Sequence, residues 1–260
     1  MKIRTVKATR YVTPLKEGGS MPAIVEADDD GLYVLKFRGA GQGIKALVAE
    51  LVAGEIGRFL GLPMPEIVFI ELDPILGQTE GDPEIQDLIK MSGGLNLGLD
   101  YLPGSITFDP LIQMPEAALA AEIIWFDALT ANVDRTPRNA NILIWHKELW
   151  LIDHGAAIYF HHNWSRFAEN ARNPFKPIKD HILLPFSGDI EKADATLNGK
   201  LSAEILAEII DQIPTDWLIE EFHSNDPAEV RASYLEFFVK RLEEPRQFVE
   251  EVRNARALQI

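Results

Sequence analysis

The sequence contains no cysteine, which excludes both disulfide bonds and thiolate metal ligands. It is also poor in basic residues, with 25 Lys and Arg against 40 Asp and Glu and a formal net charge of −15. This excess of acid disfavours nucleic acids and anionic membrane surfaces as partners, because both are polyanions. No stretch approaches the roughly 18 consecutive apolar residues that a membrane-spanning helix needs. We therefore expect no direct binding to nucleic acid and no membrane association.

The start of the chain gives no sign of export. Met1-Lys2-Ile3-Arg4 lacks the apolar core of a signal peptide, so we expect a cytoplasmic protein. With 260 residues, of which 47% are hydrophobic, the chain can build an ample core. That length suits one large domain or two lobes.

The most informative stretch begins at Asp134. The loop that follows is polar and contains Pro137, so it is not expected to be helical. Residues 142–145 and 149–152 have the composition of two short strands, joined by a linker of hairpin length. A second acid, Asp153, comes directly after the second strand. The hairpin should therefore gather Asp134, Asp153 and an intervening asparagine at its open end.

These residue types suit phosphoryl transfer. Mg²⁺ prefers oxygen ligands, usually one or two carboxylates together with substrate phosphates. The reaction also needs a residue that positions the attacking hydroxyl. We assign Asp134 as the candidate catalytic base and Asp153 as the main metal ligand. The second metal ligand is Asn139 or Asn141, which lie five and seven residues after Asp134.

The order of these residues resembles that in protein kinases and phosphoinositide kinases, and it is most similar to bacterial HipA-like kinases. Asp153-His154-Gly155 stands where protein kinases have Asp-Phe-Gly. In these families the asparagine follows the first acid by five residues and directly precedes a strand. Here Asn139 has the spacing and Asn141 has the strand register, and the register favours Asn141.

Lys36 is the candidate phosphate-binding lysine. It lies in the predicted strand 32–38, on the face shared by Leu32 and Val34, and a lysine on an apolar face needs an anion. It resembles the kinase lysine that holds ATP phosphates and pairs with a helix glutamate. Ahead of it, Gly18-Gly19-Ser20 takes the position of the phosphate-covering loop in kinases. A second glycine loop, 39–43, follows the strand and is the other candidate.

The helix predicted over residues 42–60 supplies the candidate partner of Lys36. Its apolar residues recur every three or four positions, and small residues surround Glu50. In the HipA-like pattern a glutamate on this helix precedes a Leu-Gly-Leu-x-x-Pro run, which here begins at Leu60. This favours Glu50, with Glu55 as the alternative. By the same resemblance, the hinge whose backbone pairs with adenine falls at Leu99-Asp100-Tyr101-Leu102.

The resemblance implies an α+β, bilobal, protein-kinase-like fold with a β-rich N-lobe at residues 1–102 and a helical C-lobe at 103–260. It implies a kinase that uses ATP and Mg²⁺ and transfers the γ-phosphate to a hydroxyl, which we expect to be a protein Ser or Thr. Two alternatives stay open: a small-molecule or lipid kinase on the same fold, and a nucleotide-binding regulatory module without turnover. The identity of the acceptor does not follow from the fold.

Overall fold

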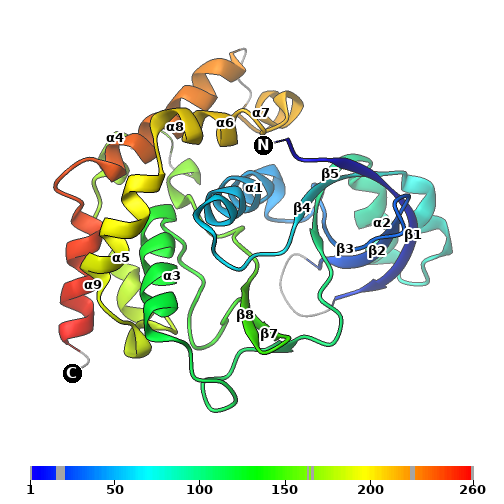
Figure 1. The fold of residues 1–260 in the computed structure, drawn as a ribbon. Helices are drawn as coiled ribbons and strands as arrows, with labels where there is room; N and C mark the ends of the chain where they lie inside the picture. Colours follow the sequence, from blue (N-terminus) through cyan, green and yellow to red (C-terminus); the bar gives the residue numbers. More distant parts are fainter. Residues whose placement is uncertain (1, 16–20, 163, 165–166, 223–225, 259–260) are drawn as a thin grey trace.

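The computed structural model describes residues 2–15, 21–162, 164, 167–222 and 226–258. A strand-rich part comes first in the chain and a helical part follows it, which gives the predicted α+β, bilobal arrangement (Figure 1). None of the described helices is both long enough and apolar enough to cross a membrane. The boundary between the lobes, which we place at residues 102–103, stays a prediction.

The N-lobe is built on a closed five-stranded barrel in the order β1-β2-β3-β5-β4. Neighbouring strands are antiparallel, except that β1 runs parallel to β4 where the barrel closes. Alternation along β3 sends Tyr33 and Leu35 into the barrel and leaves Lys36 on the outer face. The strands are β1 (Thr5–Pro14), β2 (Ala23–Ala27), β3 (Leu32–Lys36), β4 (Ile67–Leu72) and β5 (Gly94–Asp100).

Helix α1 (Gly43–Leu60) lies between the barrel and the C-terminal helices (Figure 1). It is buried nearly all round, because small residues let other elements approach it closely. A Cβ at Gly54 would lie 2.4 Å from the terminal methyl group of Ile67 in β4, so a larger residue there would require the Ile67 side chain to move. The helix ends at Gly61, whose φ of 87° is left-handed and therefore suited to glycine. Helix α2 (Pro83–Met91) covers the far side of the barrel.

The C-lobe combines a small sheet with seven described helices. Strands β6 (Ile106–Thr107), β7 (Ile142–Trp145) and β8 (Glu148–Leu151) form an antiparallel sheet in that order. Two helices begin as their cap residues predict: Ser202 accepts from the Ile205 amide, and Asp226 from the Ala228 amide. The helices are α3 (Ala117–Thr130), α4 (Phe167–Ala171), α5 (Ile190–Leu197), α6 (Ala203–Ile210), α7 (Thr215–Phe222), α8 (Pro227–Leu242) and α9 (Gln247–Ala257).

The segment after the candidate metal loop is irregular. The sequence of residues 156–160 allows either a strand or a segment that leads away from this loop; the second forms, and a short 3-10 helix covers Tyr159–His162. The amide of Ile158 donates to the Thr130 carbonyl at the end of α3, and Ile158 has a φ of +55°. Because the backbone at Ile158 bonds to the end of α3, it does not pair with another strand.

Helices α6 and α7 fasten the C-lobe to the barrel. Trp217 of α7 is fully buried, and its ring lies edge-on to Phe69 of β4 at 5.8 Å. Its Nε1 donates to the Leu95 carbonyl of β5 at 3.3 Å. Nearby, the amide of Ile3 donates to Gln212 at 3.2 Å. Residues from the two ends of the chain therefore share one core beside α1.

We predict that Trp217→Ala destabilises the whole protein rather than one lobe. Removing a buried tryptophan costs about 3–5 kcal/mol through lost transfer energy and the cavity left behind. Urea unfolding followed separately by circular dichroism and tryptophan fluorescence should show one transition at a lower midpoint. Trp145→Ala, which removes a half-buried tryptophan from β7, is the matched control and should cost clearly less. Equal losses in the two variants would contradict the structural importance of this contact.

Candidate active site

Lys36 lies where the two lobes meet. Its Nζ is 2.9 Å from Oδ1 of Asp153, which follows β8, and 3.8 Å from Oε2 of Glu50 on α1. The side chain of Lys36 is 11% exposed, whereas that of Asp153 is 41% exposed. Burial alone would lower the pKa of Lys36, but the charges of Glu50 and Asp153 outweigh it and raise that pKa. Lys36 is therefore a charged group with one accessible acidic neighbour.

Glu50 is held from both sides. The backbone amide of His154 donates to its Oε2 at 2.9 Å, and the His154 ring nitrogen Nδ1 lies 3.3 Å from its Oε1. Burial would raise the pKa of Glu50, but the charge of Lys36 and the hydrogen bonds from His154 lower it to about 2. The alternative residue, Glu55, instead pairs with Arg58 on its own helix at 2.5 Å. Glu50 thus joins α1 to β3 and to the loop after β8.

A pocket opens beside this cluster. It is lined by Lys36, Glu50 and Asp153, by the loop after β3 and by Gly155. Of the two candidate glycine loops, the second contributes Ala40, Gln42 and Gly43 to the lining. The first, Gly18-Gly19-Ser20, lies outside the described residues. The 39–43 loop is therefore a stronger candidate for contact with phosphates than its sequence alone indicates.

Asp134 and both candidate asparagines come together. Nδ2 of Asn139 donates to Oδ2 of Asp134 at 2.7 Å. Nδ2 of Asn141 lies 3.3 Å from the same carboxylate oxygen and 3.5 Å from the backbone carbonyl of Asp153. Asn139 is exposed, whereas Asn141 is buried between the two acidic positions. Asn141 is therefore the asparagine that touches both Asp134 and Asp153.

The backbone at two of these positions is left-handed. Asn141 has a φ of +48° and Asp153 a φ of +55°. Asn and Asp adopt this conformation more readily than other residues with a side chain, although it still carries some cost. Asn141 lies directly before β7, and Asp153 lies two residues after β8, so both turn the backbone at the open end of the β7–β8 hairpin. The two candidate metal ligands thus also shape the ends of the hairpin.

A buried ion pair supports these turns from below. Nε of Arg135 donates to Oδ2 of Asp127 on α3 at 2.6 Å, and both side chains are fully buried. Arg135 also donates to the backbone carbonyl of Asn141 and, at 3.5 Å, to that of Ile152. Its guanidinium therefore holds the backbone beside both Asn141 and Asp153.

His181 completes this network, since its Nε2 lies 2.9 Å from Oδ2 of Asp127. Burial would raise the pKa of Asp127, but the charge of Arg135 and the hydrogen bond with His181 lower it. In the sequence, the signal for Arg135 is its place directly after Asp134, a pair that resembles the one in phosphoinositide kinases. Asp127 is expected there to be structural rather than catalytic, and the sequence does not show that it pairs with Arg135.

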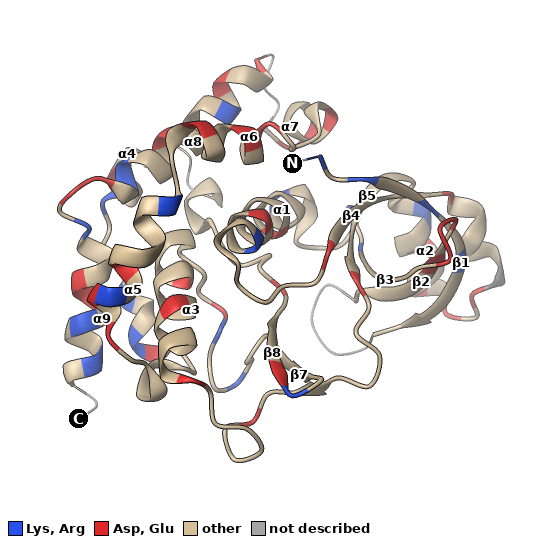
Figure 2. Ribbon diagram, in the orientation of Figure 1, with Lys and Arg blue, Asp and Glu red and all other residues tan. Residues whose placement is uncertain are grey.

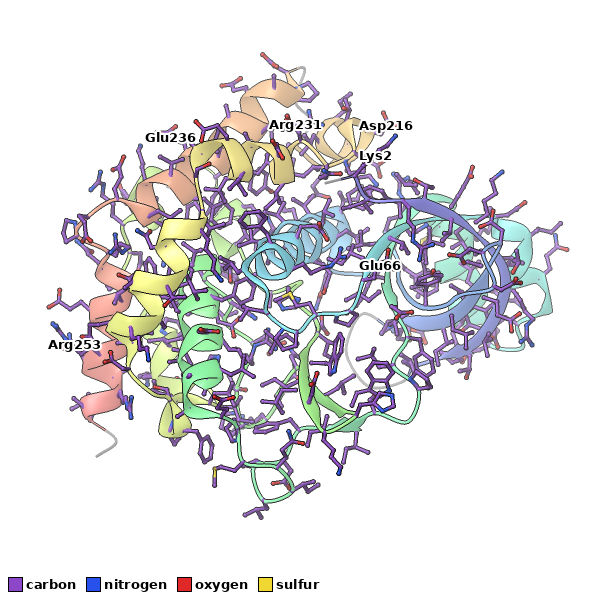
Figure 3. The ribbon with its side chains drawn as sticks, viewed as in Figure 1. Lys2, Glu66, Asp216, Arg231, Glu236 and Arg253 are labelled. Carbon is purple, nitrogen blue, oxygen red and sulfur yellow. The ribbon has the colours of Figure 1, made fainter. Side chains whose placement is uncertain are left out.

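The predicted hinge occupies the end of β5. The amide of Asp100 donates to the carbonyl of Glu66, a residue labelled in Figure 3, and the amide of Tyr101 donates to the carbonyl of Leu32, both at 2.9 Å. These two amides are thus committed to the barrel. The amide of Leu102 has no acceptor within the described part of the chain. Leu102, which is itself a buried residue, is therefore the position in the predicted hinge whose amide has no partner among the described residues.

The oxygen atoms of these side chains suit a hard cation that completes its coordination with ligands from outside the protein. Asp153 and Asp134 offer carboxylate oxygens, and Oδ1 of Asn141 accepts no hydrogen bond from the described residues. Among those residues, no group of three or more His, Asp or Glu could hold a metal ion alone. Such a site fits Mg²⁺ shared with substrate phosphates, because this ion keeps several non-protein ligands.

The architecture defines a protein-kinase-like protein. The solved structure of a proinflammatory kinase from Helicobacter pylori, CtkA, covers 98% of this chain and 99% of its own, with a TM-score of 0.53 and 13% identity. Two structures of a Golgi casein kinase, one with Mn/ADP bound, match with TM-scores of 0.49 and 0.47 at 12% and 11% identity; each covers 98% of this chain and 73% or 72% of its own. No curated protein matches the sequence significantly.

The family is settled by the sequence. The model of the HipA-like kinase family matches residues 9–251, which is nearly the whole chain. The protein therefore belongs to the HipA-like kinase family, as the motifs from Lys36 to Gly155 predict. The fold and the family together support kinase activity in general.

We predict that Asp127→Asn destabilises the protein in a pH-dependent way. Removing one partner of a buried ion pair costs about 3–5 kcal/mol at neutral pH, because Arg135 is left buried and unpaired. Since the native pKa of Asp127 lies below its usual value of 3.8, its contribution is present above that pH and declines as the pH falls further. Urea unfolding at pH 7 and pH 3 should therefore show a smaller difference between variant and wild type at pH 3. Asp180→Asn, at an exposed position, is the control and should show no difference at either pH.

Proposed function

We propose that this protein is a Mg-ATP-dependent kinase that transfers the γ-phosphate to a protein Ser or Thr hydroxyl in the cytoplasm. The observation that carries the proposal is the series of contacts from Lys36 through Asp153 and Asn141 to Asp134, which begins at the pocket that Lys36 and Asp153 line. Lys36 contacts Asp153, and Asn141 contacts both acids. A lysine, two acids and an amide in this order are the parts that phosphoryl transfer needs.

Lys36 binds the phosphates of ATP. Glu50 holds the lysine side chain in place. It is not the nearest carboxylate, because Oδ1 of Asp153 lies closer to Nζ of Lys36 than Oε2 of Glu50 does. Together these three side chains carry one positive and two negative charges. The cluster is therefore short of positive charge, and a divalent cation at Asp153 would correct this. With that cation at Asp153, Lys36 would no longer be the only positive charge beside this carboxylate, and its ammonium group would face the phosphates.

Asp153 and Asn141 hold the metal ion, with Asp134 close by. When bound, Mg²⁺ supplies charge neutralisation of the phosphate oxygens. Asp153 is the exposed carboxylate of the cluster, and Asn141 already faces both acids. Arg135 keeps the two ligands at a fixed separation, because it binds the backbone next to each of them. Asn139 is exposed, and its side chain donates to Asp134 and orients that carboxylate.

Asp134 positions the acceptor. Its Oδ2 is held by the two asparagine amides, and its other carboxylate oxygen, Oδ1, accepts no hydrogen bond from the described residues. The acceptor hydroxyl donates to that oxygen. A bond forms between the hydroxyl oxygen and the γ-phosphorus, the bond from that phosphorus to the bridging oxygen of ADP breaks, and the hydroxyl proton passes to Asp134. ADP leaves as the other product.

The adenine end of ATP lies along the hinge at Asp100, Tyr101 and Leu102, where the amide of Leu102 is the donor without an acceptor among the described residues. On the phosphate side, Gly18-Gly19-Ser20 precedes β2 in the sequence, and the 39–43 loop follows β3 and lines the pocket. The net charge of −15 argues against a phosphoinositide acceptor, which would need a basic membrane-facing surface.

We predict that Asp153→Ala abolishes metal-dependent ATP binding. Calorimetry with and without Mg²⁺ should show wild-type binding that strengthens with the metal, and binding about 100-fold weaker in the variant, which lacks a direct ligand. Asp180→Ala removes an exposed C-lobe acid and should bind like wild type. Metal-dependent binding that persists unchanged in Asp153→Ala would refute the assignment.

We predict that Asp134→Asn separates binding from turnover. ADP release in the presence of cell extract should fall by about 10²–10⁴-fold, because the variant cannot accept the hydroxyl proton. Its Mg-ATP affinity should stay within about threefold of wild type, since an amide oxygen still accepts from Asn139. Equal turnover in the two proteins would exclude Asp134 as the base. ATP binding without any ADP release by the wild type would instead favour a regulatory module.

A further inference from the structure

A second pocket lies in the C-lobe, where the ends of α4 and α8 meet the start of α9. Figure 2 shows Lys and Arg segments on this side of the molecule, away from the barrel. Three basic residues line the pocket and no acidic residue does, although the chain has 40 acids against 25 bases. The polar and aromatic lining consists of Arg172, Asn173, Lys240, Arg241, Gln247 and Phe248, with an alanine and a proline beside them.

Arg241 is the central residue of this pocket. It is only 3% exposed, and its Nη1 donates to the carbonyls of Asn170, Ala171 and Asn173 at 3.1–3.3 Å. Nη2 donates to the carbonyl of Ala128 on α3 at 2.6 Å. Its Nε is buried without a hydrogen-bond acceptor, and no carboxylate of the described residues forms an ion pair with Arg241.

Backbone carbonyls offset only part of this buried charge. The carbonyls of Asn170 and Ala171 belong to the last turn of α4, where a cation is favoured, and the rings of Phe237 and Phe248 lie 5.5 and 5.1 Å from the guanidinium carbon. Burial nevertheless lowers the pKa of Arg241 to about 9. A buried cation without an anion is costly, so this position favours an anionic ligand.

The start of α9 adds free amide donors to the same pocket. No side chain caps this helix, and the amides of Gln247 and Phe248 have no acceptor in the described part of the chain. Arg246, at the cap position, turns its side chain to Asp194 of α5 instead. The first amides of an 11-residue helix favour an anion through their open N–H groups and the helix dipole.

The other two cations at the pocket each have an acidic partner. Arg172 is 56% exposed and pairs with Glu243 at 3.2 Å. Lys240 is 27% exposed and pairs with Glu236, which is labelled on α8 in Figure 3. An exposed pair such as Arg172–Glu243 contributes about 0–1 kcal/mol, so Arg172 can turn to a stronger partner, and Lys240 adds positive charge beside it.

From these observations we propose that the pocket between α4, α8 and α9 binds a small oxyanion of the phosphate class. The ligand is free phosphate or a phosphoryl group on a side chain, since both present the same oxygens. Arg241 supplies the buried charge, Arg172 and Lys240 close over the ligand, and the Gln247 and Phe248 amides donate to it. Because Arg241 also holds the end of α4, the ligand would strengthen the contact of α4 with α3 and α8.

The test is a titration of the full-length protein, without ATP, followed by amide NMR. Inorganic phosphate and O-phosphoserine are added in separate series up to tens of millimolar, with potassium chloride at equal ionic strength as the reference. The Gln247 and Phe248 amides should shift in a saturable way with either phosphate compound and not with chloride. The thermal midpoint should rise by about 2–4 °C near saturation.

The double variant Arg172→Gln/Lys240→Gln removes two charges at the pocket and should weaken phosphate binding by about tenfold or more. Lys7→Gln/Arg253→Gln removes one Lys and one Arg with exposed partners elsewhere and is the matched control. Figure 3 labels Arg253 beside the middle of α9. This control should bind phosphate like wild type.

The site is established if the Gln247 and Phe248 amides shift in the wild type and in the control, but not in Arg172→Gln/Lys240→Gln. Whichever of inorganic phosphate and O-phosphoserine binds more tightly then identifies the source of the phosphoryl group. Absence of shifts at Gln247 and Phe248, or equal weakening in both double variants, overturns the proposal. Phosphate that enters the pocket beside Lys36 would shift the amides of residues 39–43 instead. The result therefore does not depend on whether the kinase proposal is correct.

Discussion

The structure depends on a carboxylate that is almost completely removed from water. Glu50 is 1% exposed, and a charge at that depth persists only with partners on every side. Lys36 supplies one partner from the barrel, and the His154 amide and ring supply the others from the loop after β8. Three segments that are far apart in the sequence therefore share one electrostatic constraint. The geometry of the candidate site follows from that constraint, because Asp153 directly precedes His154.

A second buried charge pair organises the C-lobe half of the site. Arg135 and Asp127 are both fully buried, and the guanidinium extends past its partner to carbonyls on either side of the β7–β8 hairpin. The two pairs act on the same loops from opposite sides. Glu50 holds the amide of His154, while Arg135 holds the carbonyls of Asn141 and Ile152. The loops that hold Asn141 and Asp153 are thus fixed by buried charges on other elements.

Helix α1 connects these local constraints to the architecture. Glu50 can reach Lys36 and His154 only if its helix is kept in place, and this helix is packed between the barrel on one side and α6 and α7 on the other (Figure 1). Trp217 anchors α7 to β4 and β5, so the C-terminal part of the chain closes over the N-lobe. The lobes are therefore joined both through the site and through a hydrophobic contact outside it.

The sequence by itself determined the family, the order of the strands and helices around the site, and the identity of most candidate residues. Those depend on local patterns: alternation places Lys36 on the outer face of its strand, glycine ends α1 at Gly61, and Asp226 caps α8. The sequence left open whether Glu50 or Glu55 reaches Lys36, and whether Asn139 or Asn141 lies between the two acids. In both cases the competing residues are a few positions apart on one element, so only the packing of that element against the rest distinguishes them. The roles of His154, Arg135 and Arg241 were decided by tertiary structure alone, because each depends on partners far away along the chain or on backbone atoms that every residue shares.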